Sequence, residues 1–248
     1  MQNAKQARIG LLTDLHYDGS APAMNRLYEA VTRINQSGAG TLLVMGDLVN
    51  AGSAFTARRL LREVEALCGM FRGPIRYMPG NHDLDHLSKR AFYEALGRDG
   101  DVPRFHFEFG GYTFICIDAN FSPGGREYDS GNFDWRESVV PEEELGWLQL
   151  RIASSPLPVI VVSHQRVDCA GTHSVENAEA VRNIIGPSGK VKAVFQGHRH
   201  EDDLKQIGGT AYYTLGAHVD AAGPAVALLD GRGVRLVRDC QSAEEVLS

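Results

Sequence analysis

Long hydrophobic runs, paired cysteines and an excess of positive charge are all absent from this sequence. No apolar stretch approaches the ~20 residues that a helix needs to cross a bilayer, so we expect no membrane partner. Four scattered cysteines, which form no C-x-x-C pair, are expected to be free thiols in a reducing compartment: Cys68, Cys116, Cys169 and Cys240. The net charge of −6 disfavours nucleic acid as a partner, because a nucleic-acid binder needs a basic face.

The N-terminal segment also lacks a signal. Residues 1–8 are polar, and no signal-peptide apolar core follows them, which predicts a cytoplasmic location. A chain of 248 residues, 43% hydrophobic and 23% charged, is typical of a soluble protein, and we expect one domain over residues 1–248. The acidic balance still permits a small phosphorylated substrate, because a bound metal would reverse the local potential. The sequence predicts no particular oligomeric state.

The hydrophobic pattern predicts an α/β fold. Strands alternate with helical patterns through the first ~100 residues, as in βαβ units. We expect helices over residues 22–37 and 53–70, the second with Ser53 as its N-cap, and further helices from Pro141 and over 175–185. Other segments read as strands: residues 9–12, 41–44, 75–78, 159–162 and 191–195, a hairpin over 105–109 and 112–117, and short strands near 211–215, 225–229 and 234–237.

Several of these strands are continuous apolar runs, which indicates burial on both faces. Two mixed sheets packed face to face, with helices outside, would provide that burial. We therefore expect a four-layer α-β-β-α sandwich with a metal site at the carboxyl ends of the strands.

Five of the expected strands end in side chains that can bind a metal. These side chains are Asp14 and His16, Asp47, Asn81, His164, and His198 with His200. In open α/β sheets, ligands bind outside the carboxyl ends of the strands, so five segments deliver oxygen and nitrogen atoms to one edge. Residues two apart, such as Asp14 and His16, point the same way on an extended segment.

The mixture of carboxylate and imidazole groups suits Mn²⁺, Fe²⁺ or Zn²⁺ better than Ca²⁺ or Mg²⁺. Seven ligands exceed the four of a closed structural zinc site and would serve two ions that share a bridge. Two such metals can clamp the attacking and leaving oxygens of a phosphoryl displacement. We therefore expect two divalent transition-metal ions as cofactors.

The ordered motifs D-x-H, G-D, G-N-H-D, H and G-H-x-H resemble those of the calcineurin-like metallophosphoesterase superfamily. The resemblance implies that a first metal is held by Asp14, His16 and His200, a second by Asn81, His164 and His198, and that Asp47 bridges both. It further implies a catalytic site in which a metal-bridging hydroxide attacks phosphorus. His82 would then donate a proton to the leaving oxygen or contact the phosphate, and Asp83 is a candidate to orient it.

The spacing of the motifs is similar to that of class III cyclic-nucleotide phosphodiesterases and, more loosely, of manganese-dependent ADP-ribose/CDP-alcohol pyrophosphatases. Asn50 stands where purple acid phosphatases carry a tyrosine ligand, so a tyrosinate–iron site is not expected. The resemblance implies hydrolysis of a small nucleotide-like phosphodiester or pyrophosphate. A phosphomonoesterase of the same family, a nuclease and a non-catalytic scaffold remain as alternatives.

Substrate selection is expected from residues 120–140 and from the segment that follows His164. Aromatic faces there could stack a base, and arginines could hold a second phosphate. The candidate substrate-binding residues are Arg126, Tyr128, Trp135 and His173. The alternative is a surface loop whose aromatic side chains pack beneath it.

Several basic residues outside these motifs have less certain roles. Arg166 and Arg199 adjoin candidate ligands and could contact phosphate or lie on the surface. His218 could reach the substrate rim, whereas His86 and His106 are expected to be ordinary surface residues.

Overall fold

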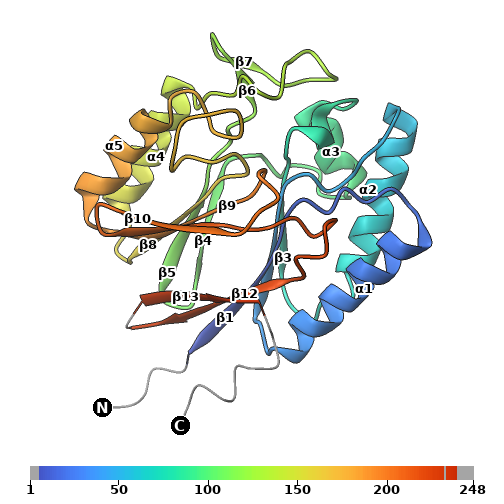
Figure 1. Ribbon diagram of the computed structural model, residues 1–248, viewed down its shortest axis with the longest axis horizontal. Coiled ribbons are helices and arrows are strands. Elements are labelled where there is room, and N and C mark those ends of the chain that lie inside the picture. The colour runs from blue at the N-terminus through green and yellow to red at the C-terminus, as the bar shows by residue number, and fades with distance from the viewer. Residues whose placement is uncertain (1–5, 232, 239–248) are drawn as a thin grey trace.

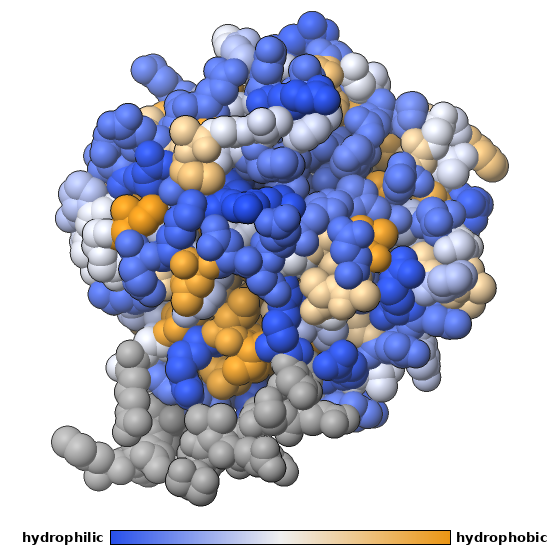
Figure 2. Space-filling model, viewed as in Figure 1, coloured by the Kyte–Doolittle hydropathy of each residue, from blue (hydrophilic) through white to orange (hydrophobic). Residues whose placement is uncertain are grey.

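The computed structural model describes residues 6–231 and 233–238. Two large β-sheets pack face to face, and helices cover the outer face of each (Figure 1). This order of layers confirms the predicted α-β-β-α sandwich of two mixed sheets. On the face seen in Figure 2, hydrophilic side chains predominate, and 23% of the residues in the chain are charged.

The first sheet has the strand order β13-β12-β1-β2-β3. Its strands are β1 (Ala7–Leu12), β2 (Thr41–Met45), β3 (Ile75–Met78), β12 (Ala225–Asp230) and β13 (Gly233–Val237). β1, β2 and β3 are parallel, and each is joined to the next by a helix, α1 (Ala21–Gln36) or α2 (Ala54–Cys68). Side-chain oxygens of Ser20 and Ser53 accept from backbone amides in the first turns of these helices, which confirms the predicted cap at Ser53.

The second sheet has the strand order β10-β11-β9-β8-β5-β4. Its strands are β4 (Phe105–Phe109), β5 (Tyr112–Cys116), β8 (Val159–Val162), β9 (Val191–Gln196), β10 (Asp203–Ile207) and β11 (Thr210–Thr214). β4 and β5 form the predicted hairpin, and α4 (Glu142–Ser154) and α5 (Ala178–Ser188) cover the outer face. The prediction missed the edge strand β10, because its residues are only partly buried and largely polar.

The described chain has four further short elements that the sequence pattern did not predict. They are the 3-10 helix η1 (His82–Leu84), α3 (Lys89–Ala95), β6 (Phe121–Ser122) and β7 (Arg126–Glu127). α3 packs against α2 beside the first sheet, whereas β6 and β7 pair only with each other at one end of the molecule.

The central core lies between the two sheets. Leu11 and Leu43 from the first sheet join the same apolar cluster as Phe114 and Ile160 from the second. Every residue of β2 and β8 is buried, which explains why their sequences are continuous apolar runs. This packing fixes the two sets of parallel strands relative to each other, and therefore fixes the loops at their carboxyl ends.

None of the cysteines is a candidate ligand. Cys68 and Cys116 are buried free thiols, Cys169 is a half-buried free thiol, and Cys240 lies outside the described residues. Among the described residues, no helix has the length and hydrophobicity that a membrane crossing requires.

Candidate metal centre

The candidate ligands follow strand ends, and most of them have unusual backbone conformations. Seven non-glycine residues of the described chain have a positive φ, and five of these are candidate ligands: Asp14, His16, Asp47, His198 and His200. Such conformations cost on the order of 1–3 kcal/mol each and persist only where the surroundings enforce them. Backbone hydrogen bonds from Asp14 to Gly46 and from His16 to Asp47, both 3.0 Å, join the loops after β1 and β2 in this way.

Glycines allow these loops to approach closely. Gly46 has a φ of +96°, and a Cβ there would collide with the ring of His164. A Cβ on Gly80 would collide with the carboxylate and the amide of Asp47. The glycines that the sequence places before ligands are therefore required by close packing between loops as well as by turning of the chain.

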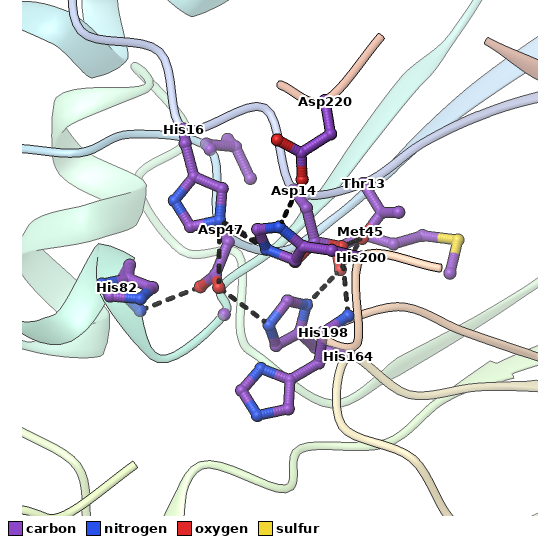
Figure 3. Close-up of polar contacts among 12 residues, drawn as sticks. Thr13, Asp14, His16, Met45, Asp47, His82, His164, His198, His200 and Asp220 are labelled. Carbon is purple, nitrogen blue, oxygen red and sulfur yellow. Dashed lines mark hydrogen bonds and ion pairs between the residues drawn. The ribbon is translucent and has the colours of Figure 1, made fainter. Parts of the chain in front are cut away.

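Two groups of candidate ligand atoms lie side by side (Figure 3). In the first, His16 Nε2 lies 3.1 Å from His200 Nε2, and Asp14 Oδ1 lies 3.5 Å from the same His200 atom. In the second, Asp47 joins His164 and His198. Asp47 Oδ2 lies 3.2 Å from His164 Nε2 and 3.8 Å from His16 Nε2, so this carboxylate faces both groups.

Buried polar atoms without partners test whether metals fit these groups. Asp14 Oδ1, His164 Nε2, His198 Nε2 and both amide atoms of Asn81 are buried and have no hydrogen-bond partner. An orphaned buried polar atom is costly, and native proteins rarely tolerate one. Four of these atoms, Asp14 Oδ1, His164 Nε2, His198 Nε2 and Asn81 Oδ1, are candidate ligand atoms with lone pairs, and bound cations would satisfy them.

In two of the candidate ligands, the second ring nitrogen has a partner. His164 Nδ1 donates to the carbonyl of Met45 at 2.9 Å, which directs its Nε2 towards Asp47. His200 Nδ1 lies 2.8 Å from Asp220 Oδ2. Metal-binding histidines usually engage their second nitrogen in this way, because the contact fixes the tautomer and the ring orientation.

The two histidines of the second group differ in their electrostatic environment. Burial lowers the pKa of His198 to about 3, so its imidazole is neutral. Burial also disfavours the charged form of His164, but the adjacent Asp47 carboxylate prevails and raises its pKa to about 10. The pKa of Asp47 is in turn well below its ordinary value: burial opposes this, and the positive charge of the adjacent His164 overcomes the opposition. A divalent cation would replace the proton that His164 holds.

His82 is more exposed than these groups, at 38% of its side chain. Its backbone amide donates to Asp47 Oδ1 at 2.8 Å, and its Nδ1 lies 2.9 Å from Asp85 Oδ2. The hydrogen bond with Asp85 is the main reason that its pKa rises to about 9. A ring nitrogen of His82, one of His16 and a carboxylate oxygen of Asp47 also lie close enough to hold an ion among them.

The expectation that Asp83 orients His82 is wrong. Asp83 is buried and turned inward, where its carboxylate accepts hydrogen bonds from the amides of Gly80, Leu48 and Val49 at 2.9–3.1 Å. It therefore locks the loop after β3 to the loop after β2. The acid that contacts His82 is Asp85, three residues along η1 rather than next in sequence, and that spacing was the missed signal.

A cavity of about 310 Å³ opens over the candidate ligands. Its lining consists of Asp47, His82, Trp135, His173, His198, Arg199 and His200. Two of the four residues expected to bind substrate, Trp135 and His173, therefore reach the cavity. Arg126 and Tyr128 do not line it: Arg126 is exposed on β7, and Tyr128 is fully buried beneath the loop.

Of the remaining basic residues, some line the cavity and others do not. Arg199 lines the cavity, whereas Arg166 is 2% exposed and pairs with Asp168 and Asp203 at 2.6–2.9 Å, so Arg166 faces no phosphate site. His218 is buried and does not line the cavity. His86 is half-buried and His106 is exposed.

Comparison with known proteins gives consistent matches. The family model described as calcineurin-like phosphoesterase matches residues 7–202. A probable cyclic nucleotide phosphodiesterase of Vesicomyosocius okutanii is 24% identical over 209 residues, which cover 79% of this chain and 80% of the relative. The 3′,5′-cyclic adenosine monophosphate phosphodiesterase CpdA of Escherichia coli K12 is 25% identical over 184 residues, 71% of this chain and 60% of the relative.

Solved structures share the fold. A dimetal phosphatase from Danio rerio superposes with a TM-score of 0.78 at 17% identity, covering 94% of this chain and 99% of that one. Purple acid phosphatase PPD1 from yellow lupin gives a TM-score of 0.66 at 13% identity, over 95% of this chain and 52% of that one. Because the family model spans most of this chain and contains all of its strand-end motifs, the chain belongs to the calcineurin-like phosphoesterase family and is a metal-dependent phosphoric ester hydrolase.

Proposed function

We propose that this protein uses two divalent metal ions to hydrolyse a small nucleotide-like phosphodiester or pyrophosphate. The observation that carries the proposal is the pair of adjacent ligand groups that Asp47 faces, each with buried atoms lacking partners. The substrate class is supported by two relatives, which are named as a cyclic nucleotide and a cyclic adenosine monophosphate phosphodiesterase.

The proposed ligand sets follow the two groups. Asp14, His16 and His200 would hold the first ion, Asn81, His164 and His198 would hold the second, and Asp47 would contact both. The family resemblance assigns Asn81 to the second set, and its burial at 1% exposure with a partnerless Oδ1 supports a role as a ligand. Oxygen and imidazole donors without thiolate favour Mn²⁺, Fe²⁺ or Zn²⁺ as the ions.

The ions, when bound, would supply Lewis acidity to the phosphoryl group and a lowered pKa for water. The protein supplies the remaining parts. His82 is the proposed proton donor to the leaving oxygen: Asp85 engages its Nδ1, so Nε2 is the ring atom available to the cavity. The backbone amide of His82 holds Asp47 Oδ1, which fixes the bridging carboxylate relative to the proton donor.

The test is turnover by protein reconstituted with Mn²⁺. We expect hydrolysis of bis-p-nitrophenyl phosphate and of at least one natural compound among cyclic nucleotides and ADP-ribose. Absence of turnover with all of these would contradict the proposal.

A phosphomonoesterase is the second candidate function. The same reconstituted protein tests it, through its relative rates on a diester and a monoester. Among the cavity-lining residues only Arg199 carries a permanent positive charge, and it already pairs with Glu201 at 2.9 Å. A dianionic monoester would need more positive charge than this, so we expect faster hydrolysis of bis-p-nitrophenyl phosphate than of p-nitrophenyl phosphate. The reverse ranking would favour the phosphomonoesterase.

A further inference from the structure

The cavity has an aromatic side that the metal chemistry does not require. The ring centre of Trp135 lies 5.5 Å from that of His198 and 5.6 Å from that of His173. Trp135 and His173 are both half-buried, and both line the cavity. An indole that packs against a candidate ligand and still faces the cavity is placed to touch whatever the metals bind.

The loop beneath Trp135 holds the indole in position before any ligand arrives. The Tyr128 hydroxyl contacts the carbonyls of Asp134 and Glu137, at 3.2 and 3.3 Å, and these contacts hold the turn on both sides of Trp135. The Tyr128 ring stacks on Phe133, with 3.8 Å between ring centres and 7° between planes. An aromatic side chain that its loop already holds in place loses little conformational entropy when a ligand stacks on it.

The proposed proton donor lies by a different group of ligands. His82 contacts His16, with ring centres 5.0 Å apart, whereas Trp135 contacts His198. Because the leaving oxygen must face its proton donor, the side with Trp135 remains for the substituent that stays on phosphorus. Arg136 lies over the indole, 4.7 Å from its ring centre, but it does not line the cavity, so the proposal depends on Trp135 and His173 alone.

We propose that Trp135, together with His173, forms a subsite for a planar heteroaromatic ring, such as a nucleobase, on the ester group that is not expelled. This inference rests on the proposed function, because it takes the leaving group to be at His82. Stacking of a base on an aromatic side chain is sequence-tolerant, so the subsite selects for a base over an alkyl group more strongly than among bases.

The test compares two diesters with the same leaving group: thymidine 5′-(p-nitrophenyl phosphate) and methyl p-nitrophenyl phosphate. We expect Trp135→Ala to lower the ratio of kcat/KM for the thymidine ester to kcat/KM for the methyl ester by about tenfold, mainly through KM. Trp135→Phe should retain most of the ratio, because it keeps an aromatic face. Trp147→Ala is the matched control, since this second tryptophan lies on α4, outside the cavity lining, and should leave the ratio unchanged.

A binding measurement separates the subsite from the hydrolytic proposal. In Trp147→Phe protein, Trp135 is the single tryptophan, and we expect thymidine 5′-monophosphate to quench its fluorescence more than ribose 5-phosphate does. Quenching by the nucleotide without turnover of either diester would support the subsite and overturn the proposed function. An unchanged ratio in Trp135→Ala, or equal fluorescence changes with both phosphates, would overturn the subsite.

Discussion

Two regions line one cavity but are built in opposite ways. The strand-end loops carry buried ligand atoms without partners on a backbone held in left-handed conformations. The segment of residues 120–140 has its polar groups paired: Tyr128 is fully buried, stacks on Phe133 and contacts two carbonyls of its own loop, and amides of the loop also donate to the carbonyls of Leu84 and Leu87. The first region is incomplete without a cation, whereas the second is complete before a ligand binds.

This difference separates catalysis from selection. Groups that require a metal are set by the strand ends and by close approach of glycine-containing loops. Trp135, the main group proposed to recognise the rest of the substrate, is set by packing within the 120–140 loop, and His173 joins it from the segment after β8. Substitutions in the first region should therefore change metal content and turnover, and substitutions in the second should change KM for large substrates.

The largest effect is expected from Asp47→Asn, because Asp47 faces both ligand groups. We predict turnover below detection and loss of bound metal, measured by a phosphodiester assay and by elemental analysis of the purified protein. Asp129→Asn, which alters an exposed carboxylate of the other region, is the matched control. Normal metal content together with normal turnover in Asp47→Asn would refute the bridge.

His82→Ala tests whether His82 is a proton donor or a metal ligand. We predict a fall in kcat of about 10²- to 10⁴-fold, the usual contribution of a positioned acid, with both metals retained. Elemental analysis decides the matter, because His82, His16 and Asp47 lie close enough to hold an ion. Loss of one metal in this variant would make His82 a ligand.

A smaller effect is expected from Asp220→Asn, which weakens the contact that orients His200. Loss of such an outer partner typically lowers metal affinity about 10- to 100-fold. Titration with Mn²⁺ should show the weakening at one site of two. Glu94→Gln, which disrupts an exposed ion pair with Arg90 on α3, should leave both affinities unchanged. Equal affinities in the Asp220 variant and the native protein would show that this contact is not needed.

The smallest effect is expected from Tyr128→Phe, which keeps the ring stack and removes the hydroxyl contacts that hold the Trp135 turn. One lost hydrogen bond of about 1 kcal/mol corresponds to a rise of up to about fivefold in KM for the thymidine ester, with metal content unchanged. Tyr213→Phe is the control, because its hydroxyl donates to Val234 away from the cavity. A loss of metal in Tyr128→Phe would mean that the two regions are not separate.

The sequence predicted the first region much better than the second. Strand-end ligands are recognisable because apolar runs such as residues 41–44 mark the strands, and parallel strands must bring their carboxyl ends to one edge. The placement of Tyr128 depends on how one loop folds on itself, and its composition permitted either stacking on substrate or packing beneath the loop. Asp85, for which the sequence predicted no role, contacts His82 in place of Asp83 because a 3-10 turn brings the third residue, not the next, back to His82.

The central claim is that these residues hold two ions, with Asp47 between them. Anomalous-difference maps from crystals of the protein grown with Mn²⁺ test it most directly. We predict two peaks about 3.5–4 Å apart, one contacted by Asp14, His16 and His200, the other by Asn81, His164 and His198, and both by Asp47. A single peak, or a second peak that excludes Asn81 and is ligated by His82, would contradict the account.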